Sequence, residues 1–450
     1  MRMKWALAAF GLVASVAAQA QSSLPPLPQV VPARSAQQIA SQRPAVEAIL
    51  AKNSASLVAL YKDLHAHPEL GFQEKATAAK LAKLMRAAGY TVTEGVGGTG
   101  IVAVLSNGEG PRILVRADMD ALPMEERTGL PYASKATAIY NGKVTPVAHS
   151  CGHDIHMAAW IGAARALAAM KDQWRGTLVF VGQPAEEGVS GARAMLADGF
   201  IERFGKADYG FALHVTPAPA GMILYRPGAM SSTSDSIDLT FHGRGAHGST
   251  PSVAIDPVLM AARFTVDVQS VISREKDPDA FGVVTVGAIQ AGEAGNVIPG
   301  EATLRGTIRS QSDQVRTKLI DGVTRTARAV AMMAGAPEPT LAIRPGGKMV
   351  MNDPKLTART AEVFRAAFGA KAQPLPVAMS GSEDFSEFVL AGTPSVYFLV
   401  GGIDPALFEA GIKAGNLAVN HSPEFAPLPE PTISAGATAM VLAVLDVAQP

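Results

Sequence analysis

The order of apolar strands and helical segments constrains the fold of this chain more than any other feature. Alanine-rich stretches at residues 45–62 and 73–88 have helical spacing, and short apolar strands alternating with a helix follow them. This alternation indicates an α/β domain whose sheet is mixed but largely parallel. We predict strands at 101–105, 113–116, 177–182 and 209–215, and a helix at 154–170.

The pattern changes after the polar run 231–234. The next segments are predicted as strand, helix, two strands, helix and strand, which is the βαββαβ order of a ferredoxin-like α+β module. After Gly346 the α/β pattern returns, with a strand at 395–400 and a last helix at 432–447. We expect a small domain inserted into a larger one, because the C-terminal part is too short to fold alone; two consecutive domains are the alternative. The predicted bounds are 45–230 and 347–450 for the larger domain and 231–346 for the inserted one.

Residues 1–20 have the layout of a secretory signal peptide. A positively charged start is followed by an apolar run and by a small-x-small cleavage motif that ends at Ala20. The run is too short for an ordinary membrane span, although an uncleaved anchor is the alternative. We therefore expect cleavage after Ala20, a secreted or periplasmic protein without membrane association, and a Pro-, Ser- and Gln-rich linker over residues 21–44.

Charge and cysteine content exclude several classes of protein. The chain has 39 Lys and Arg residues and 39 Asp and Glu residues, so its formal net charge is zero. A nucleic-acid-binding protein is therefore not expected. A single cysteine excludes a disulfide framework, a zinc finger and an all-cysteine metal cluster.

The strongest candidate site is the polar segment 149–156, HSCGHDIH. Its cysteine, Cys151, is the only one of a chain that we expect to be exported, and it lies two residues from His153. Thiolate and imidazole are good ligands for zinc, cobalt and similar divalent ions. The alternative is a small buried cysteine beside a helix that Asp154 caps.

Two adjacent carboxylates, Glu186 and Glu187, follow the apolar strand predicted at 177–182. The carboxyl ends of strands are where α/β sheets place their sites. Neighbours in an irregular turn can point apart, so that one carboxylate binds a metal while the other transfers protons. A solvated pair at the tip of a loop is the alternative.

Two further histidines stand alone. His214 lies near the end of an apolar strand and His421 in a loop before the last helix, and either could be structural rather than catalytic. Asp118 and Asp120 follow another apolar strand. They could orient metal-binding histidines, because such imidazoles usually donate their other N–H to an acceptor, or they could cap a turn.

The chain carries eight motif segments in a fixed order: DLHAHPELGFQE (63–74), VRADMDALPMEE (115–126), HSCGHDIHMAA (149–159), GQPAEEG (182–188), ALHV (212–215), NVIPGEATLRGTIRS (296–310), GSEDFS (381–386) and NHSPEF (420–425). This set resembles the metallo-aminoacylase and carboxypeptidase family of zinc-peptidase-like amidohydrolases. The resemblance runs from about residue 45 to residue 448. The chain is most similar to the branch of hippurate hydrolases, indole-acetyl-amino-acid hydrolases and N-acyl-amino-acid amidohydrolases, because Cys151 stands where relatives have an aspartate ligand.

The resemblance implies a zinc-peptidase-like catalytic domain with an inserted lid through which two copies form a homodimer. It also implies a site that holds two divalent metal ions, with Zn, Mn, Co and Ni all compatible with the mixed sulfur, nitrogen and oxygen ligands. The roles that it implies are metal ligands for Cys151, His153, Glu187, His214 and His421, a general base for Glu186, transition-state stabilisation for the lid residue His247, and binding of the substrate carboxylate for Asn296 and Arg309.

The expected function is hydrolysis of the amide bond of N-acyl or N-aroyl amino acids by a metal-activated water molecule. A carboxypeptidase or dipeptidase with the same residues and a different acyl pocket is the alternative. A non-catalytic protein that binds amino-acid conjugates is a rival of another class, but the intact set of ligands and base disfavours it.

Overall fold

The structure is a computed structural model that describes residues 34–449. Its larger sheet has eight strands in the order β1-β2-β6-β3-β7-β18-β8-β17. The four central strands, β6, β3, β7 and β18, are parallel to one another, whereas β1 and β2 at one edge pair antiparallel. This mixed, largely parallel sheet confirms the predicted α/β class. The strands are β1 (Thr91–Val96), β2 (Gly100–Asn107), β3 (Arg112–Asp118), β6 (Gly176–Gln183), β7 (Tyr209–Pro219), β8 (Ile223–Tyr225), β17 (Ala372–Pro374) and β18 (Ser395–Ile403).

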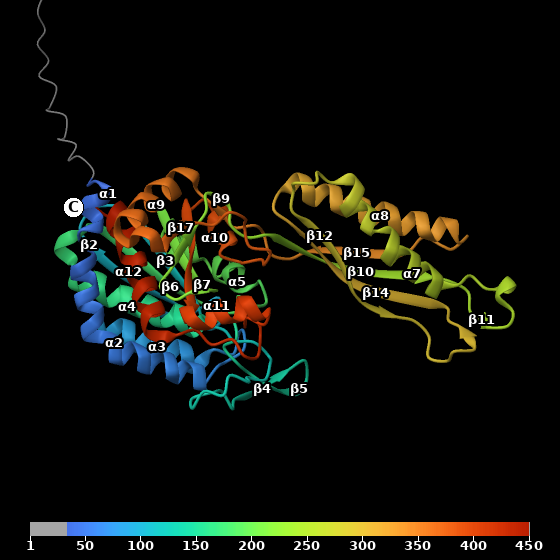
Figure 1. Cartoon of the computed structure of the whole chain (residues 1–450), viewed down its shortest axis with the longest axis horizontal. Coiled ribbons are helices and arrows are strands. Elements are labelled where there is room, and N and C mark those ends of the chain that lie inside the picture. Colours follow the sequence, from blue (N-terminus) through green and yellow to red (C-terminus); the bar gives the residue numbers. More distant parts are fainter. Residues whose placement is uncertain (1–33, 450) are drawn as a thin grey trace, which may run out of the picture. The chain divides into compact units, whose positions relative to one another are not determined.

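Helices cover both faces of this sheet. Alternate side chains of each strand point to opposite faces, so the apolar strands contribute to a hydrophobic core on each side. On β3, Ile113 and Val115 belong to one hydrophobic core and Leu114 belongs to another. The first core lies under the longer helices, among which α2, α4 and α12 pack together (Figure 1). The helices of the first core are α1 (Ala36–Ala40), α2 (Arg43–Ala66), α3 (Lys75–Ala87), α4 (His153–Ala169), α9 (Pro354–Phe368) and α12 (Pro429–Val447), and those of the second are α5 (Gly191–Ala197), α6 (Phe200–Phe204) and α10 (Ser386–Leu390).

The most apolar helix is α12, which contains the predicted segment 432–447. Among residues 34–449 it is the one helix with the length and composition of a membrane span, but most of it is buried in the protein core. Its burial accounts for its apolar character, since a helix that is apolar on every side is typical of a protein interior.

A second sheet of four antiparallel strands is formed by the segment between β9 and β16. Its strands and helices follow the order predicted for 231–346, and they enclose a hydrophobic core of their own that includes Phe241, Phe264 and Leu319. Afterwards the chain returns to the first sheet, where β18 pairs with β7. The division into two domains with those bounds stays a prediction. The elements are β10 (Thr233–His242), α7 (Pro257–Asp267), β12 (Gly282–Gln290), β14 (Glu301–Ser310), α8 (Asp313–Met333) and β15 (Thr340–Pro345).

Several further elements were not predicted from the sequence, and all of them except the helix Pro405–Ala414 have at most five residues, which are too few to show a period. The antiparallel pair β9–β16 joins the chain segments that enter and leave the second sheet. These elements are β4 (Thr137–Tyr140), β5 (Lys143–Pro146), β9 (Gly228–Ala229), β11 (Ala246–His247), β13 (Val297–Ile298), β16 (Met351–Asn352), α11 (Pro405–Ala414) and the short helical turns Lys171–Gln173, Pro251–Val253, Val271–Glu275 and Gly369–Lys371.

The predicted linker over residues 21–44 is wrong for its described part. Residues 36–40 form α1, whose first turn is held by a reciprocal capping box between the N-cap Ser35 and Gln38. Ile39 is buried, and α1 packs against α9. One apolar residue in a polar run gave too little periodicity to reveal this helix. The predicted signal peptide, residues 1–20, lies outside the described residues.

Candidate metal centre

The segment that carries Cys151 and His153 turns sharply into α4. Gly152 is the N-cap and has a φ of 91°, a conformation that favours glycine. A Cβ atom at Gly152 would lie 2.3 Å from a methyl group of Val215 on β7. The glycine therefore lets the turn approach β7. The alternative in which Asp154 caps this helix is wrong in that respect, because Asp154 lies in the first turn of α4 and accepts a hydrogen bond from the next backbone N–H.

The other candidate ligands come from three different loops or strands. Glu186 and Glu187 lie in the turn after β6, His214 lies on β7, and His421 lies in the loop before α12. Three non-glycine residues here have a left-handed backbone, with a φ of 46° at Ala185, 50° at Val189 and 68° at His421. Such strained conformations persist where the surrounding structure requires them, and they cluster at functional sites.

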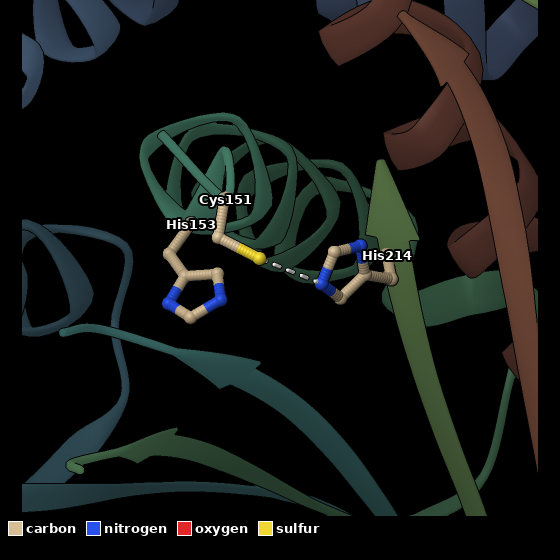
Figure 2. A group of neighbouring side chains, drawn as sticks. All are labelled: Cys151, His153 and His214. Carbon is tan, nitrogen blue, oxygen red and sulfur yellow. Dashed lines mark hydrogen bonds between the residues drawn. The ribbon is translucent and has the colours of Figure 1, made fainter. Parts of the chain in front are cut away.

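The five candidate ligands lie together around the Cys151 thiol. Its Sγ atom is 3.4 Å from Nε2 of His214 and 3.3 Å from Nε2 of His421, and Figure 2 shows how Cys151, His153 and His214 converge. Nε2 of His421 is 3.4 Å from a carboxylate oxygen of Glu187, whose other oxygen is 3.8 Å from Nε2 of His153. The structure thus brings together all five residues that the sequence selected as ligands.

The unpaired atoms of this cluster fit a divalent cation. Nε2 of His153 and Oε1 of Glu187 are buried and have no hydrogen-bond partner among the described residues. Nδ1 of His153 lies 2.8 Å from the backbone oxygen of Asp120, and Nδ1 of His214 lies 2.7 Å from that of Val215. If both Nδ1 atoms donate, the Nε2 lone pairs of both rings face the cluster, as metal ligation requires.

The electrostatics of the cluster also favour a cation. Burial raises the pKa of Glu187 to about 7. Burial and the nearby carboxylates of Glu383 and Glu187 raise the pKa of Glu186 well above its usual range, and burial together with both glutamates raises that of the Cys151 thiol. Divalent cations in this position would favour the charged forms of all three groups.

The two aspartates after β3 have different roles from each other. Asp118 accepts a 2.5 Å hydrogen bond from Nδ1 of His156, and Nε2 of His156 in turn accepts one from the backbone N–H of Val215. Asp118 therefore orients a histidine that is not a candidate ligand. Asp120 contacts the ligand His153, mainly through its backbone oxygen. Asp120 is thus placed to orient the candidate ligand His153, whereas Asp118 lies 3.8 Å from Nε2 of His153 and hydrogen-bonds His156 instead.

A buried arginine network lies behind the cluster, and the sequence analysis assigned it no role. Arg116 donates to Asp118 at 2.7 Å, to Glu383 at 2.7 Å and to Gln183 at 2.8 Å. A carboxylate oxygen of Glu383 lies within 4.8 Å of one of Glu186. The motifs VRADMD and GSEDFS contained these residues, but nothing in their spacing showed that the two segments meet.

Arg309 lies at the same cavity as the cluster. A cavity of about 900 Å³ is lined by Cys151, Glu186 and His421 and, from the second sheet, by Arg309, whose guanidinium donates to the Ser382 hydroxyl at 3.1 Å. Arg309 is half-buried and forms no ion pair within the described part of the chain, and the nearby carboxylate of Asp235 is paired with Arg316. It can therefore receive an anionic group of a ligand.

His247 and Asn296 lie elsewhere. Both are exposed, and neither is among the described residues that line the cavity. His247 pairs with Val297 in the β11–β13 pair, which lies beyond the Glu301 end of β14, whereas Arg309 lies at the other end of that strand. Eight strand positions correspond to roughly 27 Å. The structure does not bring these two predicted site residues to the cluster of their own chain.

Comparison with known proteins places this site in a family. Residues 114–445 match the sequence model of peptidase family M20/M25/M40. The chain belongs to this family. A hippurate hydrolase from Campylobacter jejuni is 38% identical over 310 residues, covering 68% of this chain and 78% of that protein. A protein named thermostable carboxypeptidase 2 from Saccharolobus solfataricus is 32% identical over 391 residues, covering 86% and 94%.

A solved structure agrees with this assignment. A dinuclear metal-binding peptidase of the M20 family from Bacillus subtilis matches with a TM-score of 0.71 and 28% sequence identity, covering 88% of this chain and 99% of that one. These findings confirm the resemblance to the metallo-aminoacylase and amidohydrolase branch. The chain is a metal-dependent amidohydrolase of the M20 family.

Proposed function

We propose that the protein hydrolyses the amide bond of N-acyl or N-aroyl amino acids, releasing a carboxylic acid and a free amino acid. The observation that carries this proposal is the presence of Arg309 in the cavity of the ligand cluster. A guanidinium group binds both oxygens of a carboxylate, which is the feature that amino-acid conjugates share. The similarity to a hippurate hydrolase supports the same substrate class.

A second candidate function is that of a carboxypeptidase or dipeptidase. The similarity to a protein named as a carboxypeptidase favours it. A C-terminal peptide bond presents the same carboxylate at the same distance from the scissile amide, so Arg309 would serve both reactions. The two functions differ in the group on the acyl side, which is an aminoacyl residue in a peptide and an uncharged acyl group in a conjugate.

The proposed cofactors are two divalent metal ions in each subunit. Cys151 belongs to two groups of three close ligand atoms, one with His153 and His214 and the other with Glu187 and His421. Its thiolate can therefore serve both ions. The mixed sulfur, nitrogen and oxygen set suits zinc, manganese, cobalt or nickel.

In the proposed reaction the ions would acidify a water molecule and polarise the amide carbonyl. The chain itself supplies the remaining steps. Glu186 removes the proton from the attacking water and delivers it to the leaving nitrogen. A carboxylate oxygen of Glu186 lies 3.8 Å from Nε2 of His153, so the base stands beside the ligand cluster. Arg309 holds the substrate carboxylate, which fixes the distance from the scissile amide to Glu186.

We also propose that the protein is a homodimer in which His247 and Asn296 complete the site of the partner subunit. The distance between the two ends of β14 supports this arrangement, because it keeps His247 from the Arg309 end within one chain. The strand β12 lies at an edge of the second sheet, where pairing with a second copy would protect it.

Subunit exchange tests the shared site. A His247→Ala protein and a Glu186→Gln protein are each expected to be inactive, and mixed dimers should regain one working site of the two. The heterodimer is isolated with two different affinity tags, and each homodimer is the control. If heterodimers form and no activity returns, the shared site is wrong.

The signal-peptide layout of residues 1–20 supports a further proposal, namely export to the periplasm or the medium followed by cleavage after Ala20. Expression of the full chain and N-terminal sequencing of the protein from each fraction test it. A soluble exported protein that starts at Gln21 is expected, and an uncleaved protein in the membrane fraction would contradict it.

A panel of N-acyl amino acids, N-aroyl amino acids and dipeptides, assayed with each of the four metal ions, tests the proposed activity. We expect amino-acid release from N-benzoylglycine or another acyl conjugate at a higher kcat/KM than from any dipeptide. Faster hydrolysis of dipeptides would establish the second candidate function instead.

A further inference from the structure

An apolar cavity lies between α11 and the loop that carries His421. Its volume is about 540 Å³, which is within the range of small-molecule sites. Most of its lining is aliphatic and includes Ile403, Leu407 and Leu417. Its two carboxylates have local partners, since Asp404 caps α11 and Glu424 accepts a hydrogen bond from Ser422. The cavity therefore suits an uncharged, apolar ligand.

The helix α11 adds apolar surface that no other segment within residues 34–449 buries. None of the ten described residues of α11 is buried. Leu407 is 67% exposed and Ile412 is 60% exposed. Exposed apolar side chains beside an apolar cavity, as at Leu407, are typical of binding grooves.

One loop connects this cavity with the metal centre. Residues 416–418 line the apolar cavity, and Asn420 and His421 line the cavity of the ligand cluster. Between them lies Val419, whose side chain is 47% exposed. An apolar chain that leaves the metal centre along this loop therefore meets an apolar residue and then the cavity.

The wall between the two cavities is thin. A Cβ atom added at Gly402 would lie 2.5 Å from a methyl group of Val215 and 3.1 Å from Pro427. Val215 lines the cavity of the ligand cluster, and Pro427 lines the apolar cavity. The two cavities are thus neighbours, although they share no lining residue within the described part of the chain.

The orientation of a bound substrate also bears on which cavity receives its acyl group. In an amino-acid conjugate the carboxylate and the acyl group lie on opposite sides of the scissile amide. Arg309 contacts Ser382 and holds the carboxylate there in the proposed reaction. The acyl group then extends away from Arg309. Asn420 and His421 line the cavity of the ligand cluster, and residues 416–418 of the same loop line the apolar cavity.

We propose that the apolar cavity under α11 binds the hydrocarbon tail of a fatty-acyl group, and that the preferred substrates are medium- and long-chain N-acyl amino acids. This inference rests on the proposed function and adds its substrate class. Each methylene that moves from water into such a cavity strengthens binding about fourfold.

A series of acetyl, hexanoyl, decanoyl and hexadecanoyl derivatives of one amino acid tests the proposal with the metal-loaded full protein. We expect kcat/KM to rise with chain length by about fourfold for each methylene that enters the cavity. Leu407→Asp should lower the ratio of decanoyl to acetyl kcat/KM by at least about tenfold, since it places a charge against the tail.

The matched control is Ile412→Asp, which adds the same charge to an equally exposed residue of the same helix that does not line the cavity. This variant should keep the wild-type ratio. Equal values of kcat/KM across the series, or equal effects of the two variants, would overturn the proposal. Analytical ultracentrifugation gives a further test. If Leu407→Asp converts a dimer into a monomer, the surface is a contact between copies of this chain and the proposal is wrong.

A binding measurement separates this inference from the proposed function. Calorimetric titration of decanoate and of N-decanoyl amino acid into the Glu186→Gln protein is expected to show binding that Leu407→Asp weakens and Ile412→Asp does not. If this binding is seen while the wild-type protein cleaves no conjugate, the tail site stands and the reaction is wrong. If N-benzoylglycine is cleaved while neither decanoyl compound binds more tightly than its acetyl counterpart, the reaction stands and the tail site is wrong.

Discussion

Nε2 of His421 lies 3.3 Å from Sγ of Cys151, although the two residues are 270 positions apart in the chain. Backbone contacts fix this approach, because the N–H of His421 donates to the oxygen of Ser150 at 2.8 Å and the side chain of Asn420 donates to the oxygen of Cys151 at 2.9 Å. The second sheet lies between these residues in the sequence. The ligand cluster therefore exists only when the chain has returned from the second sheet to the first.

Replacement of the thiol tests the centre of this cluster. We predict that Cys151→Ser loses most bound metal and activity, because a hydroxyl group is a poor substitute for a thiolate ligand. The buried site should otherwise keep its packing, so circular dichroism should show an unchanged fold. Metal content is measured by mass spectrometry on protein purified in parallel with the wild type. Full metal content and turnover in the variant would show that Cys151 is a packed core residue only.

The two adjacent glutamates are expected to differ. Glu186→Gln should retain metal and lose at least about 100-fold in kcat, which is the usual contribution of a general base. Glu187→Gln should instead weaken metal binding, because its carboxylate lies within 3.4 Å of Nε2 of His421. Each variant is the control for the other, and an exchange of the two phenotypes would reverse the assignment.

The buried arginine is predicted to matter for stability. Arg116→Met should cost about 3–5 kcal/mol in the free energy of unfolding, because it leaves the carboxylates of Asp118 and Glu383 buried without their cation. Arg344→Met is the matched control. Its ion pair with Asp238 is mostly exposed, so its loss should cost only about 0–1 kcal/mol. Denaturant unfolding of both variants makes the comparison, and equal losses would contradict it.

His65 gives a prediction about pH. Burial alone would lower its pKa, but hydrogen bonds to Asp154 at 2.6 Å and Glu126 at 3.0 Å outweigh burial and raise the pKa from 6.5 to about 10. Because the folded-state pKa is raised, the stabilising contribution is complete below pH 6.5 and is lost as the pH rises towards 10.

The measurement is the difference in unfolding free energy between the wild type and His65→Gln. This difference should shrink as the pH rises across that range, by at most about 1.4 kcal/mol per pH unit. His242→Gln removes a more exposed pair with Glu301 and serves as the control, with a small effect expected at every pH. A difference that is constant from neutral pH to pH 10 would contradict the prediction.

The larger elements could be predicted from the sequence because each had a long, regular pattern. The strands predicted at 101–105 and 177–182 lie within β2 and β6, and the helix predicted at 154–170 is displaced by only one residue from α4. Sequence alone gave no basis for α11, whose apolar residues are not on one buried face, or for β11 and β13, which have two residues each. Their formation depends on contacts with distant segments.

The candidate ligands could be selected because metal-binding side chains are chemically distinctive. The residues that support them were harder to find. Arg116 looked like part of a buried strand, and its carboxylate partner Glu383 is 267 positions away, so only the folded chain reveals the pair. Likewise, the spacing of residues could not show that Arg309 shares a cavity with the ligands and that His247 does not.

Metal titration of the apoprotein tests whether ions bound at the ligand cluster are required for hydrolysis. The protein is stripped with a chelator, and bound metal and amino-acid release from the best acyl conjugate are measured as zinc, manganese, cobalt or nickel is added, with the Glu186→Gln protein as the control. We predict no hydrolysis by the apoprotein, recovery of activity as up to two ions bind to each subunit, and the same metal binding without recovery in the control. Undiminished hydrolysis by the metal-free protein, or a metal-loaded wild type that cleaves neither an acyl conjugate nor a peptide, would contradict metal-dependent amide hydrolysis at this site.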